Sequence, residues 1–538
     1  MKKNMLNIYK LVIRQVFLYN KIGDKMNRAE ASVKNSSFSI ITQVLTVVIN
    51  FVVKTVFIYT LGSEYLGVNG LFSNIITMLS LADLGIGVAI PYSLYKPLSE
   101  KNNQKIKTLM NFYKKIYNMI GIVVLLIGLS ITPFLPLIIK DMPENIPHIY
   151  LIYDLFVIHS ASSYFFIYKK FLIDSDQKSY ITSKITFIFS TILSIIQIFI
   201  LIFTHNFILF LLSSIFIVII QNIYISKKAE NLYPYLKEKN IDELDKKEYK
   251  DIKKNISSLF IYKVGNVIMN GTDNIVISKI IGLIEVGIYS NYLLIINSIY
   301  NILNQIFNAI TSSIGNLVVT TDEKRSLNVY ENLNFFTFTL YGTVCICIMV
   351  LINPFINLWI GESYLLSNLV SFLIAFNLFL TGMQSVTSSF RNAYGLFYKA
   401  KYRPILMCVL NIIISIVLAK YIGIAGVILG TIISKLVTII WLDPYIIYHY
   451  GFKENVSKFY KQYAIYLLCY LLINFVIYTI YKYIVIKNIF MFVIYGTLTF
   501  IVTSLIICLL FHKTKEFKYF YNYFMIKFNK ILNKKSLS

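Results

Sequence analysis

Charged residues are scarce in this chain of 538 residues: they make up 14% of it, whereas 57% is hydrophobic and the mean hydropathy is +0.66. Acidic residues are scarcest, with 26 Asp and Glu against 51 Lys and Arg. A soluble domain with this balance could not stay in solution, and apolar runs of 18 or more residues recur along the chain. We therefore predict an all-α integral membrane protein.

The sequence also lacks the motifs of most catalytic and metal sites. Its five cysteines all fall within apolar runs, with no CxxC pair and no histidine at ligand spacing, so we interpret them as small core residues. No Walker A sequence, HExxH pair, GxSxG elbow or EF-hand loop is present. We therefore expect no cofactor and no enzyme activity, because no predicted loop is long enough to fold as a catalytic domain.

Apolar runs predict about fourteen transmembrane helices, and the loops between them carry most of the positive charge. Of the 51 Lys and Arg, 43 fall on one side when alternate segments are assigned to it, five on the other side and three inside spans. Positive residues accumulate in cytoplasmic loops, so this bias predicts cytoplasmic termini and argues against nucleic acid as the partner. The predicted units are a basic cytoplasmic N-terminus (1–33), a first six-span lobe (34–226), a cytoplasmic linker (227–254), a second six-span lobe (255–450), two further spans (451–511) and a basic cytoplasmic tail (512–538).

Residues 1–33 allow two interpretations. Either they form a short amphipathic helix on the inner leaflet, or translation starts at Met26. The abundance of Lys, Ile, Asn and Tyr is typical of an AT-rich genome and favours a bacterial source.

The two lobes repeat the same design at an offset of 220 positions. Each begins at basic residues, continues through roughly 20 apolar residues, enough to cross about 30 Å of hydrocarbon, and ends at glycines. The repeat pairs Lys34 with Lys254, Asn35 with Asn255, Ser37 with Ser257, Gly62 with Gly282, and Gly67 with Gly287. This pattern indicates a duplicated membrane half.

Three lysines, Lys54, Lys263 and Lys435, lie inside predicted spans. A charge there costs about 2.5 to 3.5 kcal/mol on insertion scales, so each is a functional candidate. Lys435 is about eleven residues from either end of its span, roughly 16 Å, and cannot easily reach the interface. Lys54 and Lys263 lie nearer an end, where a long side chain could extend to the interface instead. If all three face one cavity, they form a cationic lining suited to a pyrophosphate or another anion.

Acidic side chains also fall inside predicted spans, among them Asp83, Asp154 and Asp273. They either pair with the lysines between helices or, for Asp83 and Asp273, couple transport to protons or sodium.

Five segments carry a resemblance to a known family: LGSEYLGVNGLFSNIITMLSLADLGIG, TDNIVISKIIG, SNYLLIIN, FRNAYG and GIAGVILGTIISKL. They resemble the Wzx-type oligosaccharide flippases of the MOP superfamily, and the resemblance covers about residues 27–511. It implies a MATE-like fold of two six-helix lobes in a V around a cavity, plus two extra helices. It also implies that Lys54, Lys263 and Lys435 meet the substrate's diphosphate, with Arg391 in FRNAYG as a fourth candidate.

The resemblance implies a function in the bacterial plasma membrane. The chain is expected to flip undecaprenyl-diphosphate-linked oligosaccharides for surface polysaccharide or O-antigen export. Membrane lipids surround it, and a polysaccharide polymerase and glycosyltransferases are candidate partners.

Two alternatives stay open. The first is a MATE-like small-molecule exporter, which shares the architecture, although three cavity lysines should repel cations. The second is a membrane-embedded polymerase or acyltransferase. Such an enzyme should show a large external loop or a His/Asp constellation, and neither is present in the sequence.

Overall fold

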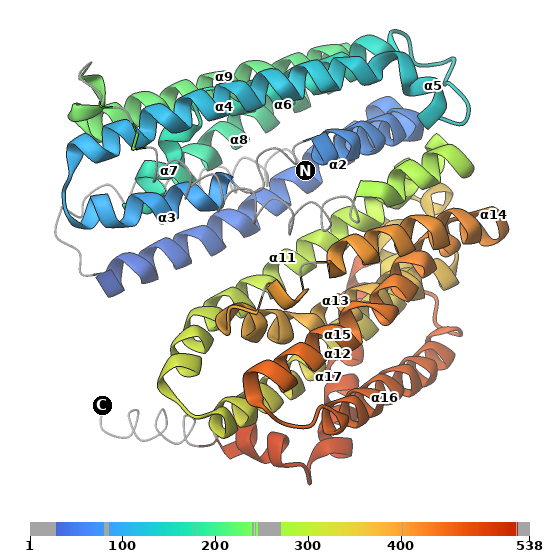
Figure 1. Cartoon of the computed structure of the whole chain (residues 1–538). Coiled ribbons are helices and arrows are strands. Elements are labelled where there is room, and N and C mark those ends of the chain that lie inside the picture. Colours follow the sequence, from blue (N-terminus) through green and yellow to red (C-terminus); the bar gives the residue numbers. More distant parts are fainter. Residues whose placement is uncertain are drawn as a thin grey trace, which may run out of the picture.

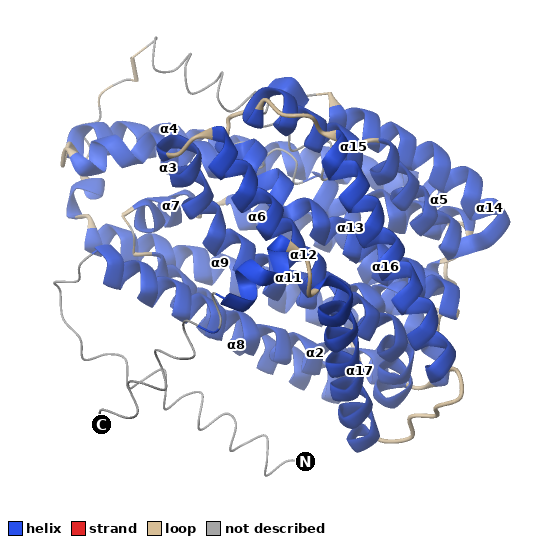
Figure 2. Ribbon diagram, turned by 90° about the horizontal axis from the view of Figure 1, so that it is seen from below, coloured by secondary structure: helices blue, strands red, loops and turns tan. Residues whose placement is uncertain are grey.

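The computed structural model describes residues 28–79, 86–176, 178–238, 242, 244–245, 271–396, 398–400, 402–522 and 525. Within these residues the chain is helical, with no β-strand, as Figure 2 shows. Helices satisfy their own backbone hydrogen bonds, which a segment surrounded by lipid requires. The predicted all-α fold is confirmed.

The helices form two layers in Figure 1, coloured blue to green and yellow-green to red. The first lobe contains α2 (Arg28–Leu79), α3 (Ile86–Ser99), α4 (Asn103–Ile131), α5 (Leu135–Ile138), α6 (Ile149–Tyr164), α7 (Tyr168–Ser175), α8 (Ser179–Thr204) and α9 (Phe207–Leu232). The second contains helical residues 271–280, α11 (Leu283–Thr320), α12 (Glu323–Ile360), α13 (Asn368–Ala393), α14 (Arg403–Val437), α15 (Ile439–Ile446), the π-helical η7 (Ile447–Phe452), α16 (Ser457–Tyr481) and α17 (Ile489–Phe511).

Two of the long helices, α2 and α14, each bend at a glycine, so that the chain continues from one span into the next. Gly62 has φ 84° inside α2, and Gly423 has φ 59° inside α14, a backbone region that favours glycine. Among the described residues, ten helices are long and apolar enough to cross a membrane, or eleven if α6 and α7, bent by 45°, form one span. Because α2 and α14 each contain one predicted span and continue into the next, these helices account for most of the expected set. The span predicted at 256–280 lies mainly outside the described residues, so the total of fourteen stays a prediction.

The start of the linker lies against the first lobe. The Tyr233 hydroxyl donates to Asp176 Oδ2 at 2.8 Å, and Lys107 Nζ donates to Glu238 at 2.7 Å. Burial, together with the Asp176 charge, raises the pKa of Tyr233, so this hydroxyl stays protonated and able to donate. We name this end of the molecule, where α9 and α13 end, the linker side, and the other end, where α12 ends, the opposite side.

The main contact between the lobes among the described helices is that of α2 with α11. A Cβ built on Gly67 would lie 2.1 Å from the carbonyl oxygen of Leu283, and one on Gly287 would lie 2.6 Å from that of Ser63. Ser63 and Leu283 are 220 positions apart, as are Gly67 and Gly287. Each glycine therefore contacts the residue that lies the same number of positions before its own equivalent in the other lobe, as in a two-fold symmetric interface.

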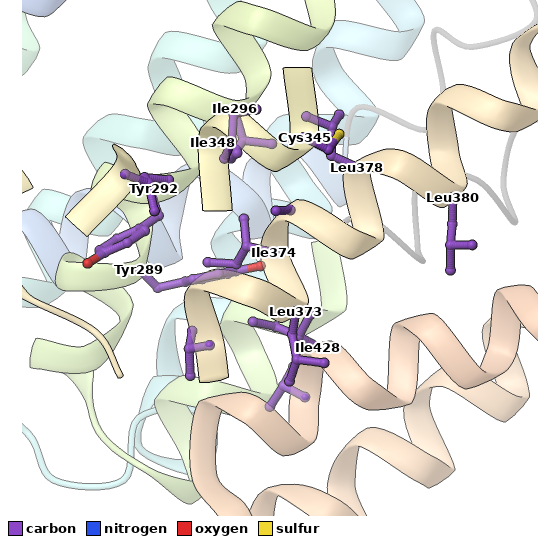
Figure 3. Close-up of a cluster of buried hydrophobic side chains, with 14 of the residues drawn as sticks. Tyr289, Tyr292, Ile296, Cys345, Ile348, Leu373, Ile374, Leu378, Leu380 and Ile428 are labelled. Carbon is purple, nitrogen blue, oxygen red and sulfur yellow. The ribbon is translucent and has the colours of Figure 1, made fainter. Parts of the chain in front are cut away.

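Apolar side chains pack the interior of the second lobe. Figure 3 shows residues of α11, α12, α13 and α14 in this cluster, including Tyr292, Cys345, Leu378 and Ile428. The outer faces are apolar as well: Leu472 and Phe475 of α16 are 64% and 68% exposed. Such surfaces suit contact with lipid tails.

Candidate functional site

A cavity of about 750 Å³ lies in the second lobe and reaches α2 of the first lobe. Its volume is within the range of roughly 300 to 1,000 Å³ common for ligand sites. Amides and hydroxyls dominate its polar lining, which consists of Asn74, Thr77, Asp273, Asn274, Tyr289, Asn297, Tyr300, Asn304, Asn377, Thr381, Gln384, Ser385, Ser388, Ser389, Asn392, Arg403, Thr431 and Lys435. Such a wall can replace the hydrogen bonds of water around a polar solute.

Helix geometry places many of these groups on the cavity. On α11, Asn297, Tyr300 and Asn304 recur at spacings of three and four residues, so they share one face. On α13 a longer polar stripe follows the same spacing: Asn377, Thr381, Gln384, Ser388 and Asn392. Neither stripe was predicted from the sequence. Their signal was the periodic recurrence of polar residues inside apolar spans.

Lys435, a predicted site residue, lies on the cavity wall and is only 7% exposed. Its ammonium donates to Asn377 Oδ1 at 2.5 Å and to Thr381 Oγ1 at 2.6 Å. Asp273, also predicted, lines the same cavity and interacts with Lys435 electrostatically. The structure therefore brings these two opposite charges together in one cavity.

Asp273 belongs to a hydrogen-bond network that connects residues 271–280 to both halves of α14. Thr431 Oγ1 lies 3.3 Å from each Asp273 carboxylate oxygen, and Asn411 Nδ2 donates to Thr431 Oγ1 at 2.8 Å. Thr272 Oγ1 donates to Asn411 Oδ1 at 3.0 Å. These partners fix the orientation of the carboxylate at the cavity wall.

Three buried charges meet at the linker side of the second lobe. Arg391 Nη1, in the last turn of α13, donates to Asp443 Oδ2 at 2.6 Å. Arg403, at the start of α14, donates to the same oxygen. The predicted Arg391 is 1% exposed and is not part of the cavity lining, whereas Arg403, which sequence reasoning missed, is part of it. Arg403 precedes Pro404 in a predicted loop, where a basic residue looked like part of the loop charge bias.

Among the described residues, the predicted Lys54 and Asp154 do not join this cavity. Lys54, in the first half of α2, is absent from its lining and has no hydrogen bond or ion pair to another described residue. Asp154 lies in α6 of the first lobe and accepts a hydrogen bond of 2.7 Å from Thr132 Oγ1. Lys263 and Asp83 lie outside the described residues. Whether Lys54 and Lys263 meet a substrate stays a prediction.

Aromatic contacts join the lobes at the opposite side. Trp359 Nε1, near the end of α12, donates to Thr55 Oγ1 of α2 at 2.8 Å. The Tyr59 hydroxyl donates to the Trp359 carbonyl oxygen at 3.0 Å, and the Phe51 and Trp359 rings stack with centroids 4.1 Å apart. Together with the glycine contact of α2 and α11, these interactions hold the lobes closed at this side.

Solved transporter structures share this fold. An inward-facing multidrug resistance MATE family transporter of the MOP superfamily matches with a TM-score of 0.62 and 14% identity over 76% of this chain and 98% of that chain. The lipid II flippase MurJ, in an inward closed conformation, matches with a TM-score of 0.62 and 16% identity over 88% and 98%. An outward-facing MATE family transporter matches with a TM-score of 0.50 and 13% identity over 79% and 99%.

No protein-family model and no curated protein sequence matches this chain. The structural likeness defines its class: it is a multi-pass membrane protein with the fold of the MOP-superfamily transporters, as the sequence predicted. Membership of the Wzx-type flippases within that superfamily stays a prediction.

Proposed function

We propose that this protein flips undecaprenyl-diphosphate-linked oligosaccharides across the bacterial plasma membrane. The observation that carries the proposal is the cavity lined by amides and hydroxyls inside an apolar helical lobe. A hydrated glycan cannot cross hydrocarbon unaided, because each polar group would lose its hydrogen bonds to water. The stripes on α11 and α13 supply replacement partners, while the polyprenyl tail stays among the lipids.

The position of the lobe contacts supports loading from one side. Trp359 and the glycine pair Gly67 and Gly287 close the opposite side. If the linker is cytoplasmic, as the charge bias predicts, the cavity in this state serves the inner leaflet. Rocking of the lobes then exposes the headgroup outside. A negative interior favours outward passage of an anion by about 2.3 kcal/mol per charge per 100 mV.

Within this proposal, Lys435 contacts the headgroup, and Asp273 either balances the lysine charge or couples transport to an ion. Lys54 and Lys263 remain candidates for the first and second lobes. Export of small cations is disfavoured, because the described cavity lining holds two cations, Arg403 and Lys435, against one acid.

The proposal is tested by the sidedness of the lipid-linked product. Deleting the gene should leave sugar assembly intact, so lipid-linked oligosaccharide accumulates while surface polymer disappears. The accumulated units should resist an externally added glycosidase, and restoring the wild-type gene should reverse both effects. Units that are accessible from outside would refute flipping and favour the polymerase alternative. The absence of any accumulation would point to a substrate other than a lipid-linked glycan.

A further inference from the structure

A short helix follows directly where the last span ends. α17 ends at Phe511, and the C-terminal helix, residues 515–522, begins after three further residues. The Thr514 hydroxyl accepts a hydrogen bond of 3.3 Å from the Phe517 backbone N–H and donates one of 2.8 Å to the Phe511 carbonyl oxygen. A side-chain oxygen in this position is a typical helix N-cap. Thr514 therefore both starts the C-terminal helix and ties it to the end of α17.

Aromatic side chains hold the C-terminal helix against α12. The Phe517 ring centroid lies 6.5 Å from that of Phe335. The Phe520 ring centroid lies 5.7 Å from that of Phe336. Residues three positions apart share one face of a helix, so these two rings define its packed face. Their partners belong to the first half of α12, which ends at the opposite side, so the C-terminal helix lies toward the linker side.

The outward face of the C-terminal helix is positively charged. Lys515 and Lys518 lie on it, one turn apart, and Lys513 precedes the helix; all three are exposed. Within the part of the chain that the structure describes, their ammonium groups have no hydrogen bond or ion pair. Glu516 lies toward α16, where it accepts a hydrogen bond of 3.3 Å from Gln462 Nε2. Three positive charges thus stand against one negative charge that faces the protein.

These lysines lie close to the end of the apolar surface. α17 presents apolar side chains to its surroundings as far as Leu509 and Leu510, which are 72% and 56% exposed. Lys513 is three residues beyond Leu510, at most about 10 Å along the chain. Tyr519 and Tyr521 are 52% and 55% exposed beside the lysines. Tyrosine is enriched at membrane–water interfaces, so this surface suits the level of the lipid headgroups.

We propose that Lys513, Lys515 and Lys518 bind the headgroups of anionic phospholipids at the linker side of the membrane. Each ammonium group can donate hydrogen bonds to phosphate oxygens, and the negative potential of an anionic lipid surface attracts it. The packing of the helix on α12 keeps the lysines at one depth, so they meet the same layer of headgroups. The contact anchors the second lobe in one leaflet, whichever molecule the protein transports.

Lipid retention by the purified full-length protein tests the proposal. The test variant combines Lys513→Gln, Lys515→Gln and Lys518→Gln. In native mass spectrometry, titration with phosphatidylglycerol should show that this variant binds the lipid about tenfold or more weakly than the wild type, because three attractive charges are lost. Binding of phosphatidylcholine, which has no net charge, should not change. Unaltered binding of phosphatidylglycerol would refute the proposal.

The matched control removes the same number of charges from the opposite side. It combines three exposed lysines, Lys420→Gln, Lys482→Gln and Lys487→Gln. This control should bind phosphatidylglycerol as the wild type does. Equal weakening in both triple variants would mean a general attraction of the lipid to positive charge, and no localised contact.

A second variant keeps every lysine and separates a docked helix from a basic tail. Phe517→Ser with Phe520→Ser removes the packing on α12, so the lysines are no longer held at one depth. Binding of phosphatidylglycerol should weaken in this variant as well. Unchanged binding would mean that charge alone is sufficient and that the docked helix is not the site.

One further outcome would identify a different occupant. If the triple-lysine variant keeps phosphatidylglycerol but loses binding of a polyglutamate peptide, the surface takes an acidic protein segment, and the assignment to lipid is wrong. None of these measurements uses export of a lipid-linked oligosaccharide. A failure of the proposed flippase function would therefore leave the expected lipid binding unchanged.

Discussion

Lys435 has neutral oxygen atoms as its direct hydrogen-bond partners, with Asp273 acting on it through space. Both acceptors, Asn377 and Thr381, come from α13, so the lysine of α14 also links two helices of the second lobe. A substrate oxygen in the cavity can replace one of these neutral acceptors without separating an ion pair. The ammonium is therefore held in place and still able to exchange a partner.

Substituting Lys435 should impair transport more than it impairs folding. Hydrogen bonds to a charged group contribute about 1.5 to 3 kcal/mol, so we expect Lys435→Ala to slow export by about tenfold or more and Lys435→Arg to keep part of the activity. Export of lipid-linked oligosaccharide and the amount of protein in the membrane should be measured together. Lys420→Ala is the control, because Lys420 is an exposed residue of the same helix. Full export with Lys435→Ala would mean that the lysine has no part in transport.

Burial of single charges was only partly predictable from sequence. The distance of Lys435 from both span ends indicated that it stays inside, and its position on the cavity wall agrees. Arg403 lines the cavity and Arg391 does not, because of the way the ends of α13 and α14 pack against Asp443 of α15. The spacing of residues along one helix does not determine this packing. Hydropathy treats both arginines alike as loop residues.

At the scale of helices, glycine has two separate roles in α2. Gly62 bends the helix through its positive φ, and Gly67 lets α11 approach within a distance that no Cβ permits. The repeat in the sequence predicted that these positions matter, because both have a glycine equivalent in the second lobe. The polar stripes were missed because the average hydropathy of a span hides a periodic polar face.

Enlarging Gly287 should weaken the contact between the lobes. A Cβ there would lie 2.6 Å from the Ser63 carbonyl oxygen, and overpacking of this kind costs about 1 to 3 kcal/mol. We expect Gly287→Ala to lower the thermal unfolding temperature in detergent and to reduce export. Gly315→Ala, on the same helix with open space around it, should gain about 0.5 to 1 kcal/mol from helix propensity. Equal behaviour of the two variants would contradict the close approach.

At the scale of the whole molecule, two lobes meet at the opposite side and enclose a polar cavity toward the linker side. The sequence predicted two lobes from the repeat and from the linker charge. The sequence could not predict that the cavity lies mainly in the second lobe, because the position of the cavity depends on how α11 and α13 face each other. It also gave no indication of Trp359 as a contact between lobes, since α2 and α12 are about 300 residues apart in the chain.

The predicted topology follows from the distribution of Lys and Arg, and reporter fusions test it. Fusions after Lys239 and at the C-terminus should report a cytoplasmic location, and fusions near Asp141 and Glu362 an external one. An external signal from the linker would contradict the fourteen-span arrangement and reverse the side that the cavity serves. The fusions after Lys239 and at the C-terminus act as controls for each other, because an even number of predicted spans separates them and must give them the same result.

The contact of Gly67 with Gly287 has a consequence for the origin of the chain. If the lobes arose by duplication, as the 220-position repeat predicts, the two positions were one codon in a gene for a single lobe. The same crossing would then have brought that glycine against its own copy in a homodimer, where one mutation alters both sides of the interface at once. In a fused chain each half can change alone, and an unequal lining of the two lobes is the expected consequence.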